Sequence, residues 1–297
     1  MTEGAGRGGT PSRDSVEEWL RALVPQRGLA RQARAVVEAA ASHPGRVSHA
    51  SASEVAELAG VNVGTVTRAA QSLGFAGWPP FQRELRARYL SHLTAPEVAR
   101  QHDAGSTPAA ASLRRDLDHL AMLTRDDLEG VRAMAAAVGG ARRTLVLGDG
   151  SYASVAIALA HNARIAGYDV EAVVGGGADT ANRLAAAQPG DVLLVVTFWR
   201  LYENAVLAAE VARRRGVRVW VLTDAVAPAL SAVADGVVTV PAEGVAFFPS
   251  LTAGLAVAQA VVSELAALDP ARSRAAVAAA DEQWRTFGLL HRGDAGR

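Results

Sequence analysis

The chain of 297 residues contains no cysteine and no lysine. Without cysteine it has no disulfide bond, no thiolate zinc site and no cysteine nucleophile. All thirty basic residues are arginine, a bias that we attribute to GC-rich codon usage, and thirty acidic residues balance them. The resulting net charge of zero leaves no overall positive field that would indicate a nucleic-acid partner.

Long hydrophobic runs are also missing, because arginine, aspartate or glutamate interrupts every apolar stretch before it reaches membrane-spanning length. No secretory signal is recognisable, so we expect a cytoplasmic protein with no membrane partner. The seven histidines lie apart in the sequence, and the chain has neither a G-x-S-x-G elbow nor a P-loop. We therefore predict no catalytic residue, no metal site and no cofactor.

Half of the residues are apolar, and the length suffices for two folded domains. Composition and periodicity predict a disordered, glycine-rich tail over residues 1–14 and an all-helical domain over 15–93. A linker is expected over 94–111, where proline and glycine interrupt the pattern, followed by a second domain over 112–290 and a tail over 291–297.

The stretch SASEVAELAGVNVGTVTRAAQSLGF in the first domain has the pattern of a helix-turn-helix. Ser51 and Glu54 fit a capping box, which predicts that a helix begins there. Gly60 suits the sharp exit from that helix. Asn62 is a favourable N-cap for a second helix that runs to about Leu73.

In this second helix Val66 and Ala70 are predicted to face inward, which leaves short polar side chains and one arginine to point outward. Such side chains reach base edges and phosphates in the major groove. The alternative is an ordinary amphipathic helix pair with a solvated face. The predicted DNA-binding residues are Ser53, Asn62, Val63, Gly64, Thr65, Thr67, Arg68 and Gln71.

The next segment, GFAGWPPFQRELRARYL, is aromatic and basic. The prolines in residues 78–80 predict an extended entry into a helix that carries Phe81, Leu85 and Leu90 on one face. Phe75, Trp78 and Phe81 are expected to close the core of the first domain.

Five valine-rich runs alternate with helix-like segments in the second domain, a pattern typical of a parallel sheet covered by helices on both faces. Ligands of such open α/β folds bind where strands end and helices begin. The runs are residues 144–148, 168–174, 191–197, 217–223 and 236–240.

The loop after the first run contains Gly148 and Gly150, which allow a tight turn whose backbone amides can hold an anion. It also satisfies the loose dinucleotide pattern G-x-G-x-x-A. A nicotinamide site would need an acidic residue at the end of the next strand, and Glu171 instead falls inside that run. The dinucleotide alternative is therefore weaker than an anion site.

The loop after the third run reads TFWRLY, which is bulky for a plain turn. Either Trp199 packs beneath the loop and Arg200 is solvated or paired with Glu203, or Arg200 and Tyr202 bind an anionic small molecule. Further strand-end and helix-start residues can line the same crevice or merely cap helices. The predicted ligand-binding residues are Gly148, Asp149, Gly150, Ser151, Tyr152, Thr197, Arg200, Tyr202, Thr223, Asp224 and Ser250.

The chain resembles the RpiR/MurR family of bacterial transcription regulators. In the first half the resemblance rests on ASEVAELAGVNVGTVTRAAQSLGFAGWPPFQRELR, and in the second half on GDVLLVVT, ARRRGVRVWVLTD and FFPS. The resemblance implies an all-α helix-turn-helix domain followed by an α/β sugar isomerase (SIS) domain. It implies a homodimer or homotetramer that binds a double-stranded DNA operator and senses a small anionic effector, by default a phosphosugar.

Two loops depart from the family pattern. The serine usual in the first loop falls on Tyr152, with Ser151 one position early, and TFWRLY replaces the usual S-x-S-G-x-T, keeping hydroxyls only at Thr197 and Tyr202. Two alternatives therefore stay open beside a metabolite-sensing regulator. One is a phosphosugar isomerase with an accessory N-terminal domain, and the other is a SIS domain that serves only for dimerisation.

Overall fold

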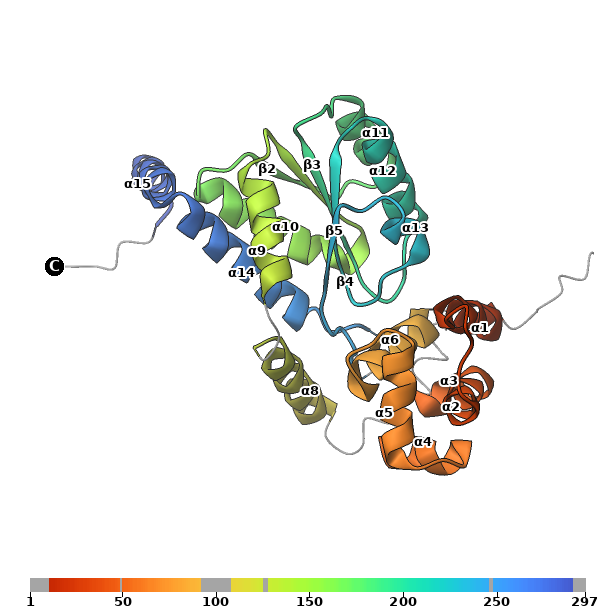
Figure 1. Cartoon of the computed structure of the whole chain (residues 1–297). Coiled ribbons are helices and arrows are strands. Elements are labelled where there is room, and N and C mark those ends of the chain that lie inside the picture. Colours follow the sequence, from red (N-terminus) through yellow and green to blue (C-terminus); the bar gives the residue numbers. More distant parts are fainter. Residues whose placement is uncertain (1–10, 49, 92–107, 125–127, 246–247, 291–297) are drawn as a thin grey trace, which may run out of the picture. The chain divides into compact units, whose positions relative to one another are not determined.

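The structure is a computed structural model that describes residues 11–48, 50–91, 108–124, 128–245 and 248–290 (Figure 1). The chain divides into two compact units, the first made of residues 1–105 with 245–248 and the second of residues 106–244 and 249–297. Each unit is described by itself below.

The first unit is helical, as predicted. Its helix α1 begins at Pro11, so the predicted tail over residues 1–14 is wrong for its last four residues. Proline is favourable at the first helical position, where its missing N–H group has no partner to lose. The helices are α1 (Pro11–Leu23), α2 (Arg31–Ser42), α3 (Pro44–Val47), α4 (Ala52–Ala59), α5 (Val63–Ser72) and α6 (Trp78–Ser91).

Helix α6 begins at Trp78, so the predicted extended entry over residues 78–80 is also wrong. Both prolines lie in the first turn, where no backbone donor is required, and their fixed φ angle suits a helix start. The side chain of Gln82 in this helix donates to the carbonyl oxygens of Val47 and Ala50, at 2.9 and 2.5 Å. Helix α6 thereby fixes the turn that leads into α4.

The core of the first unit is aromatic at one end, as expected. The ring of Phe81 stacks on Trp19 with centroids 5.7 Å apart and meets Phe75 edge-on at 5.4 Å. Trp78 and Leu85 are buried beside them, whereas the side chain of Leu90 lies outside the described residues. These rings join the small side chains of α2, α4 and α5 in one cluster, which holds the helix-turn-helix rigid.

The second unit contains a five-stranded parallel sheet with the order β2-β1-β3-β4-β5. Each strand lies within one of the five predicted runs, because buried strands of a parallel sheet are apolar on both faces. The strands are β1 (Thr144–Gly148), β2 (Val170–Val173), β3 (Val192–Thr197), β4 (Arg218–Thr223) and β5 (Gly236–Thr239).

Helices cover both faces of this sheet, as predicted (Figure 1). One face packs against α9 (Glu129–Gly139), α10 (Ala153–Ile165) and α14 (Thr252–Leu268). The other face packs against α11 (Gly177–Ala185), α12 (Glu203–Arg214) and α13 (Pro228–Ser231).

Two further helices complete the unit, α8 (Pro108–Leu123) and α15 (Pro270–Thr286). Because α8 begins at Pro108, the predicted linker over 94–111 is wrong for residues 108–111. Residues 94–107 of that prediction lie outside the described residues. Within the described residues no single helix is long and apolar enough to cross a membrane, although α14 and α15 pass that test as a pair bent by 110°.

The strand order also locates the crevice of the sheet. The chain moves from β1 outward to β2 and then returns to β3 on the other side of β1. In open parallel sheets, the loops that leave two such neighbouring strands diverge and form a ligand crevice at their carboxyl ends. The loops after β1 and β3 are the two that the sequence singled out.

Candidate nucleic-acid interface and ligand crevice

The start of α4 has the predicted capping box. The Ser51 hydroxyl accepts from the Glu54 N–H at 3.2 Å, and the Glu54 carboxylate accepts from the Ser51 N–H at 2.7 Å. The side-chain hydrogen bond from Ser51 lowers the pKa of Glu54 below its ordinary value. Gly60 ends the helix with a φ of 64°, a left-handed conformation that costs glycine little.

The predicted N-cap of α5 is confirmed as well, because Asn62 Oδ1 accepts from the Thr65 N–H at 2.9 Å. Asn62, Val63, Gly64, Arg68 and Gln71 are exposed. Thr67 is partly exposed, and Ser53 is exposed on α4. The helix therefore presents its front turn and one side to solvent.

Thr65 is the exception, since only 3% of its surface is exposed and the prediction that it points outward is wrong. Its hydroxyl donates to Asn62 Oδ1 at 3.0 Å. The same hydroxyl accepts a hydrogen bond from Arg68 Nη2 at 3.2 Å. Burial of the methyl group against the core turns the hydroxyl toward these two neighbours. The result is a short chain of hydrogen bonds that orients the exposed guanidinium of Arg68.

A groove of about 370 Å³ lies beside Arg68 between α5 and the start of α2. Its walls include Arg27 and Gln32, two polar residues that the sequence reasoning missed. Helix α2 begins without a side-chain cap, so its first backbone N–H groups are not bound by a capping side chain. Guanidinium groups and a helix N-terminus favour an anion such as a phosphate.

In the sheet unit, the first crevice loop turns as tightly as the sequence predicts. A Cβ atom on Gly148 would lie 2.8 Å from the carbonyl oxygen of Tyr152, so only glycine fits there. Gly150 has a φ of 59° and starts a single 3-10 turn that leads into α10. The exposed Ser151 lies in this turn.

Tyr152 is buried and does not offer its hydroxyl to the crevice. The hydroxyl donates to the carbonyl oxygen of Phe198, and the ring meets Phe198 and Tyr202 edge-on with centroids 5.5 and 5.9 Å away. Burial raises the pKa of Tyr152 to about 12. The residue at the position of the usual serine thus ties the first crevice loop to the third.

The third crevice loop divides into a buried half and an exposed half. Phe198 and Trp199 are buried, and Trp199 adopts a φ of 52°, uncommon for a residue with a side chain. Its N–H group donates to Asp224 Oδ1 at 2.9 Å, which holds that conformation. Trp199 therefore packs within the fold, whereas Arg200 and Tyr202 are exposed at the crevice.

Tyr202 lies over the first loop, because its hydroxyl is 3.0 Å from the position a Cβ atom on Gly150 would take. Next to it, the amide of Asn204 donates to both carboxylate oxygens of Asp149, at 3.2 and 3.0 Å, and to the Thr180 hydroxyl at 3.2 Å. The sequence reasoning missed Asn204 and Thr180. Asn204 had one available signal, its position in the first turn of the helix after the third strand.

The hydroxyls of the other predicted ligand residues bond within the fold. Thr197 donates to the Arg200 carbonyl at 3.4 Å and Thr223 to the Ala225 carbonyl at 2.9 Å. The alternative that Thr223 or Asp224 caps α13 is wrong, because that helix has no side-chain cap. Ser250 donates to the carboxylate of Asp116 in α8 at 2.5 Å.

Two further sequence expectations concern a dinucleotide site and a metal site. Glu171, which weighed against a dinucleotide site, forms an ion pair with Arg183 within the sheet unit. Among the described residues, no three histidine or acidic side chains gather as a candidate metal site.

Comparisons with known proteins match both units. The model of the helix-turn-helix domain of the rpiR family matches residues 22–92, and that of the SIS domain matches residues 140–264. A comparison with curated proteins finds no match.

Several solved structures are similar. The sugar isomerase domain of an RpiR transcription factor from Sphaerobacter thermophilus is 27% identical, with 60% of this chain and 99% of that one covered and a TM-score of 0.56. Vibrio vulnificus NanR complexed with ManNAc-6P is 18% identical over 93% of this chain and 100% of that one, with a TM-score of 0.58. An E. coli CFT073 protein in complex with A5P is 18% identical over 57% and 93%, with a TM-score of 0.51. The last two similarities show the fold alone.

Proposed function

Because the chain belongs to the RpiR family, with an rpiR-type helix-turn-helix domain followed by a SIS domain, we propose that it is a transcription regulator that binds a double-stranded DNA operator. The observation that carries the proposal is the exposed front of α5, where Thr65 orients Arg68. We expect it to act in the cytoplasm, where the DNA of a bacterial cell lies, and as a homo-oligomer, because helix-turn-helix proteins commonly bind paired half-sites as dimers.

Helix α5 is the proposed recognition helix. Arg68 is the side chain best suited to read a base, since a guanidinium can form two hydrogen bonds with guanine. Gln71, Thr67 and the backbone of Gly64 offer further polar contacts, and Val63, which is 46% exposed, offers an apolar surface for a thymine methyl group. The groove that includes Arg27 lies beside this helix and suits a backbone phosphate.

The test is DNase footprinting of the purified protein on genomic DNA, followed by affinity measurements on the protected site. Arg68→Ala should weaken binding by about 1–3 kcal/mol, or roughly 5- to 150-fold. Arg214→Ala is the matched control, because Arg214 is an exposed arginine in the sheet unit that pairs only loosely with Glu210. Failure to protect any site would refute the proposal, and equal affinities of both variants would remove Arg68 from the interface.

We further propose that the crevice at the ends of β1 and β3 takes a small carbohydrate derivative as the effector. The Asp149 carboxylate, positioned by Asn204, is a suitable acceptor for sugar hydroxyls, and the exposed Arg200 and Tyr202 suit an anionic substituent. Two structures of similar fold contain ManNAc-6P and A5P, which supports a sugar phosphate as the first ligand class to test. A ligand that favours one arrangement of the oligomer would change operator affinity.

Thermal shift against a panel of phosphorylated and unphosphorylated sugars tests this proposal, because a ligand stabilises the folded state by mass action. Asp149→Asn should abolish the shift caused by an active sugar, whereas Glu210→Gln, an exposed change on α12, should leave it intact. A shift that persists in Asp149→Asn would place the ligand elsewhere.

A second candidate is a SIS domain that serves only for dimerisation. The rings of Tyr152 and Trp199 favour it, because they are buried at positions where the family pattern has serine, and the buried Phe198 lies between Thr197 and Trp199. Absence of any thermal shift from a protein that still assembles would support this candidate. In both cases we propose that the protein has no catalytic turnover, and conversion of ketose or aldose phosphates by the purified protein would contradict that.

A further inference from the structure

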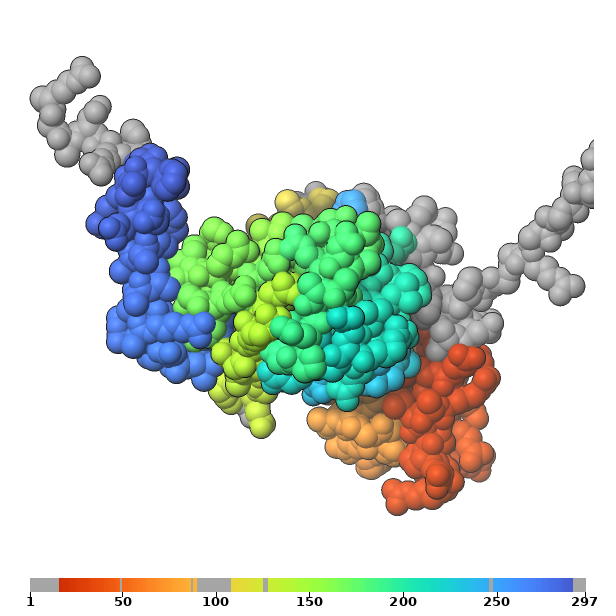
Figure 2. All heavy atoms as spheres, turned by 90° about the horizontal axis from the view of Figure 1, so that it is seen from above, coloured from red at the N-terminus to blue at the C-terminus, as the bar shows by residue number. Residues whose placement is uncertain are grey.

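Helix α15 contributes little to the fold of its own chain. It has 17 residues, of which Ser273 alone is buried. Figure 2 shows α15 as the outermost part of the sheet unit, and the chain bends by 110° between α14 and α15. Most of the stability of a helix in a protein comes from packing of one apolar face, so a helix with so little burial calls for a further partner.

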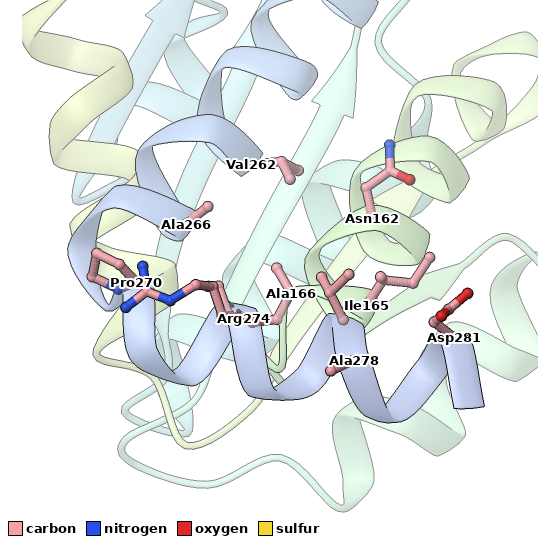
Figure 3. Close-up of a pocket in the computed structure, with 11 residues that line it drawn as sticks. Asn162, Ile165, Ala166, Val262, Ala266, Pro270, Arg274, Ala278 and Asp281 are labelled. Atoms are coloured by element: carbon pink, nitrogen blue, oxygen red, sulfur yellow. Dashed lines mark hydrogen bonds between the residues drawn. The ribbon is translucent and has the colours of Figure 1, made fainter. Parts of the chain in front are cut away.

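The inner side of α15 forms a groove of about 690 Å³ with α10 and α14 (Figure 3). Its lining is mostly apolar and includes Ile165, Val262 and Val277. Val277 in this groove is 46% exposed. An exposed apolar surface rimmed by polar residues is typical of an interaction site.

Two opposite charges frame this apolar surface. Arg274 and Asp281 both line the groove and lie seven residues apart on α15, about 10 Å along the helix axis. Val277 and Ala278 lie midway between them. Asp281 also forms an ion pair with Arg285, four residues further along the same helix, so its carboxylate already has one cationic neighbour. Along this face of the helix the order is therefore a cation, an apolar stretch, and a carboxylate that is paired on its far side.

We infer that this groove is the interface with a second copy of the chain, in which the two α15 helices pack antiparallel about a two-fold axis near Val277 and Ala278. An isologous interface requires the same surface to be complementary to itself. Antiparallel pairing sets Arg274 against Asp281 of the partner subunit, and the symmetry repeats the pair. Parallel pairing would set like charges against each other, which disfavours that orientation.

A second copy supplies both the exposed Val277 and the complementary charges. The inference goes beyond the proposed regulator, since it names the surface and the helix orientation of the assembly, and it can be tested without DNA or effector.

A charge exchange in the full-length protein tests the orientation. Sedimentation velocity over a concentration series should show that Arg274→Asp and Asp281→Arg each weaken dimerisation by about tenfold or more, because each sets like charges together. The double variant restores both pairs with reversed polarity and should regain most of the lost affinity, although Arg285 no longer has its pairing carboxylate at position 281. Glu282→Arg, the neighbouring exposed residue on α15, is the control and should leave dimerisation unchanged.

The absence of cysteine allows a second, independent measurement. Ala278→Cys lies next to the proposed axis and should be cross-linked to its own copy by a short bis-maleimide. Ala185→Cys, exposed on α11, should not be cross-linked. The inference is overturned if both single charge variants remain dimers, if the double variant fails to recover, or if Cys at 278 is not cross-linked in a protein that sediments as a dimer. Circular dichroism of each variant distinguishes loss of the dimer from loss of the fold.

Discussion

Replacing Thr65 by valine tests how the helix-turn-helix presents Arg68. Thr65 is 3% exposed, and its hydroxyl bonds to Asn62 and Arg68 at 3.0 and 3.2 Å. Valine retains the branched shape that fills the core and removes both bonds. Since an intramolecular hydrogen bond contributes about 0.5–1.5 kcal/mol net, we expect the free energy of unfolding to fall by about 1 kcal/mol.

The effect on DNA affinity follows from the loss of orientation. Fixing a long arginine side chain costs up to about 1.5–2 kcal/mol of rotamer entropy, part of which Thr65 removes before DNA binds. Thr65→Val should therefore weaken binding by about 1 kcal/mol, less than Arg68→Ala does. In the Arg68→Ala background the same change should have no effect on affinity, because no guanidinium is left to orient.

The assay is fluorescence anisotropy on the footprinted operator with the four proteins of this double-mutant cycle, together with urea unfolding of each. The expected coupling energy between the two residues is about 1 kcal/mol. Thr65→Ser keeps the hydroxyl and serves as the control. If Thr65→Val weakened DNA binding equally in both backgrounds, Thr65 would not act through Arg68 and the reasoning would be refuted.

Three further predictions concern stability. Gly254→Ala should cost about 1–3 kcal/mol in urea unfolding, because the new Cβ atom would lie 2.7 Å from the Phe198 ring. Tyr152→Phe should lower the free energy of unfolding by about 1–3 kcal/mol, because a buried carbonyl oxygen loses its donor. In the original protein this stability is present below pH 10 and is lost as pH rises toward the raised pKa of about 12, so the variant should lack that pH dependence. Because the pKa of Glu54 is lowered in the folded protein, its carboxylate contributes stability above pH 4.5, the ordinary pKa, and this stability is lost as pH falls through the lowered pKa. Glu54→Gln should therefore flatten the acid side of a profile of unfolding free energy against pH.

Local rules account for most of what the sequence predicted correctly. The starts of α4 and α5 depend on hydrogen bonds between residues three apart, Ser51 with Glu54 and Asn62 with Thr65. Such contacts form from neighbouring residues alone, so their pattern is visible in the sequence. The buried strands were equally visible, because both faces of a parallel sheet demand apolar residues.

The predictions that failed were of a different kind. Proline in residues 78–80 and at Pro108 marked loops in the sequence, but each proline lies in the first turn of a helix, where it is tolerated. Thr65 was placed outward because it is polar, and the packing of α2 against α5 decides that it is buried.

The chemistry of the crevice was decided by tertiary structure alone. Asn204 meets Asp149 across 55 positions of the sequence, and the Tyr152 hydroxyl meets Phe198 across 46. No local spacing encodes such contacts, since they exist only once the parallel sheet has set the ends of β1 and β3 side by side. The sequence by itself determined that this chain has a helix-turn-helix and a sheet with loops at its carboxyl ends, and only the folded sheet decided which side chains those loops hold together.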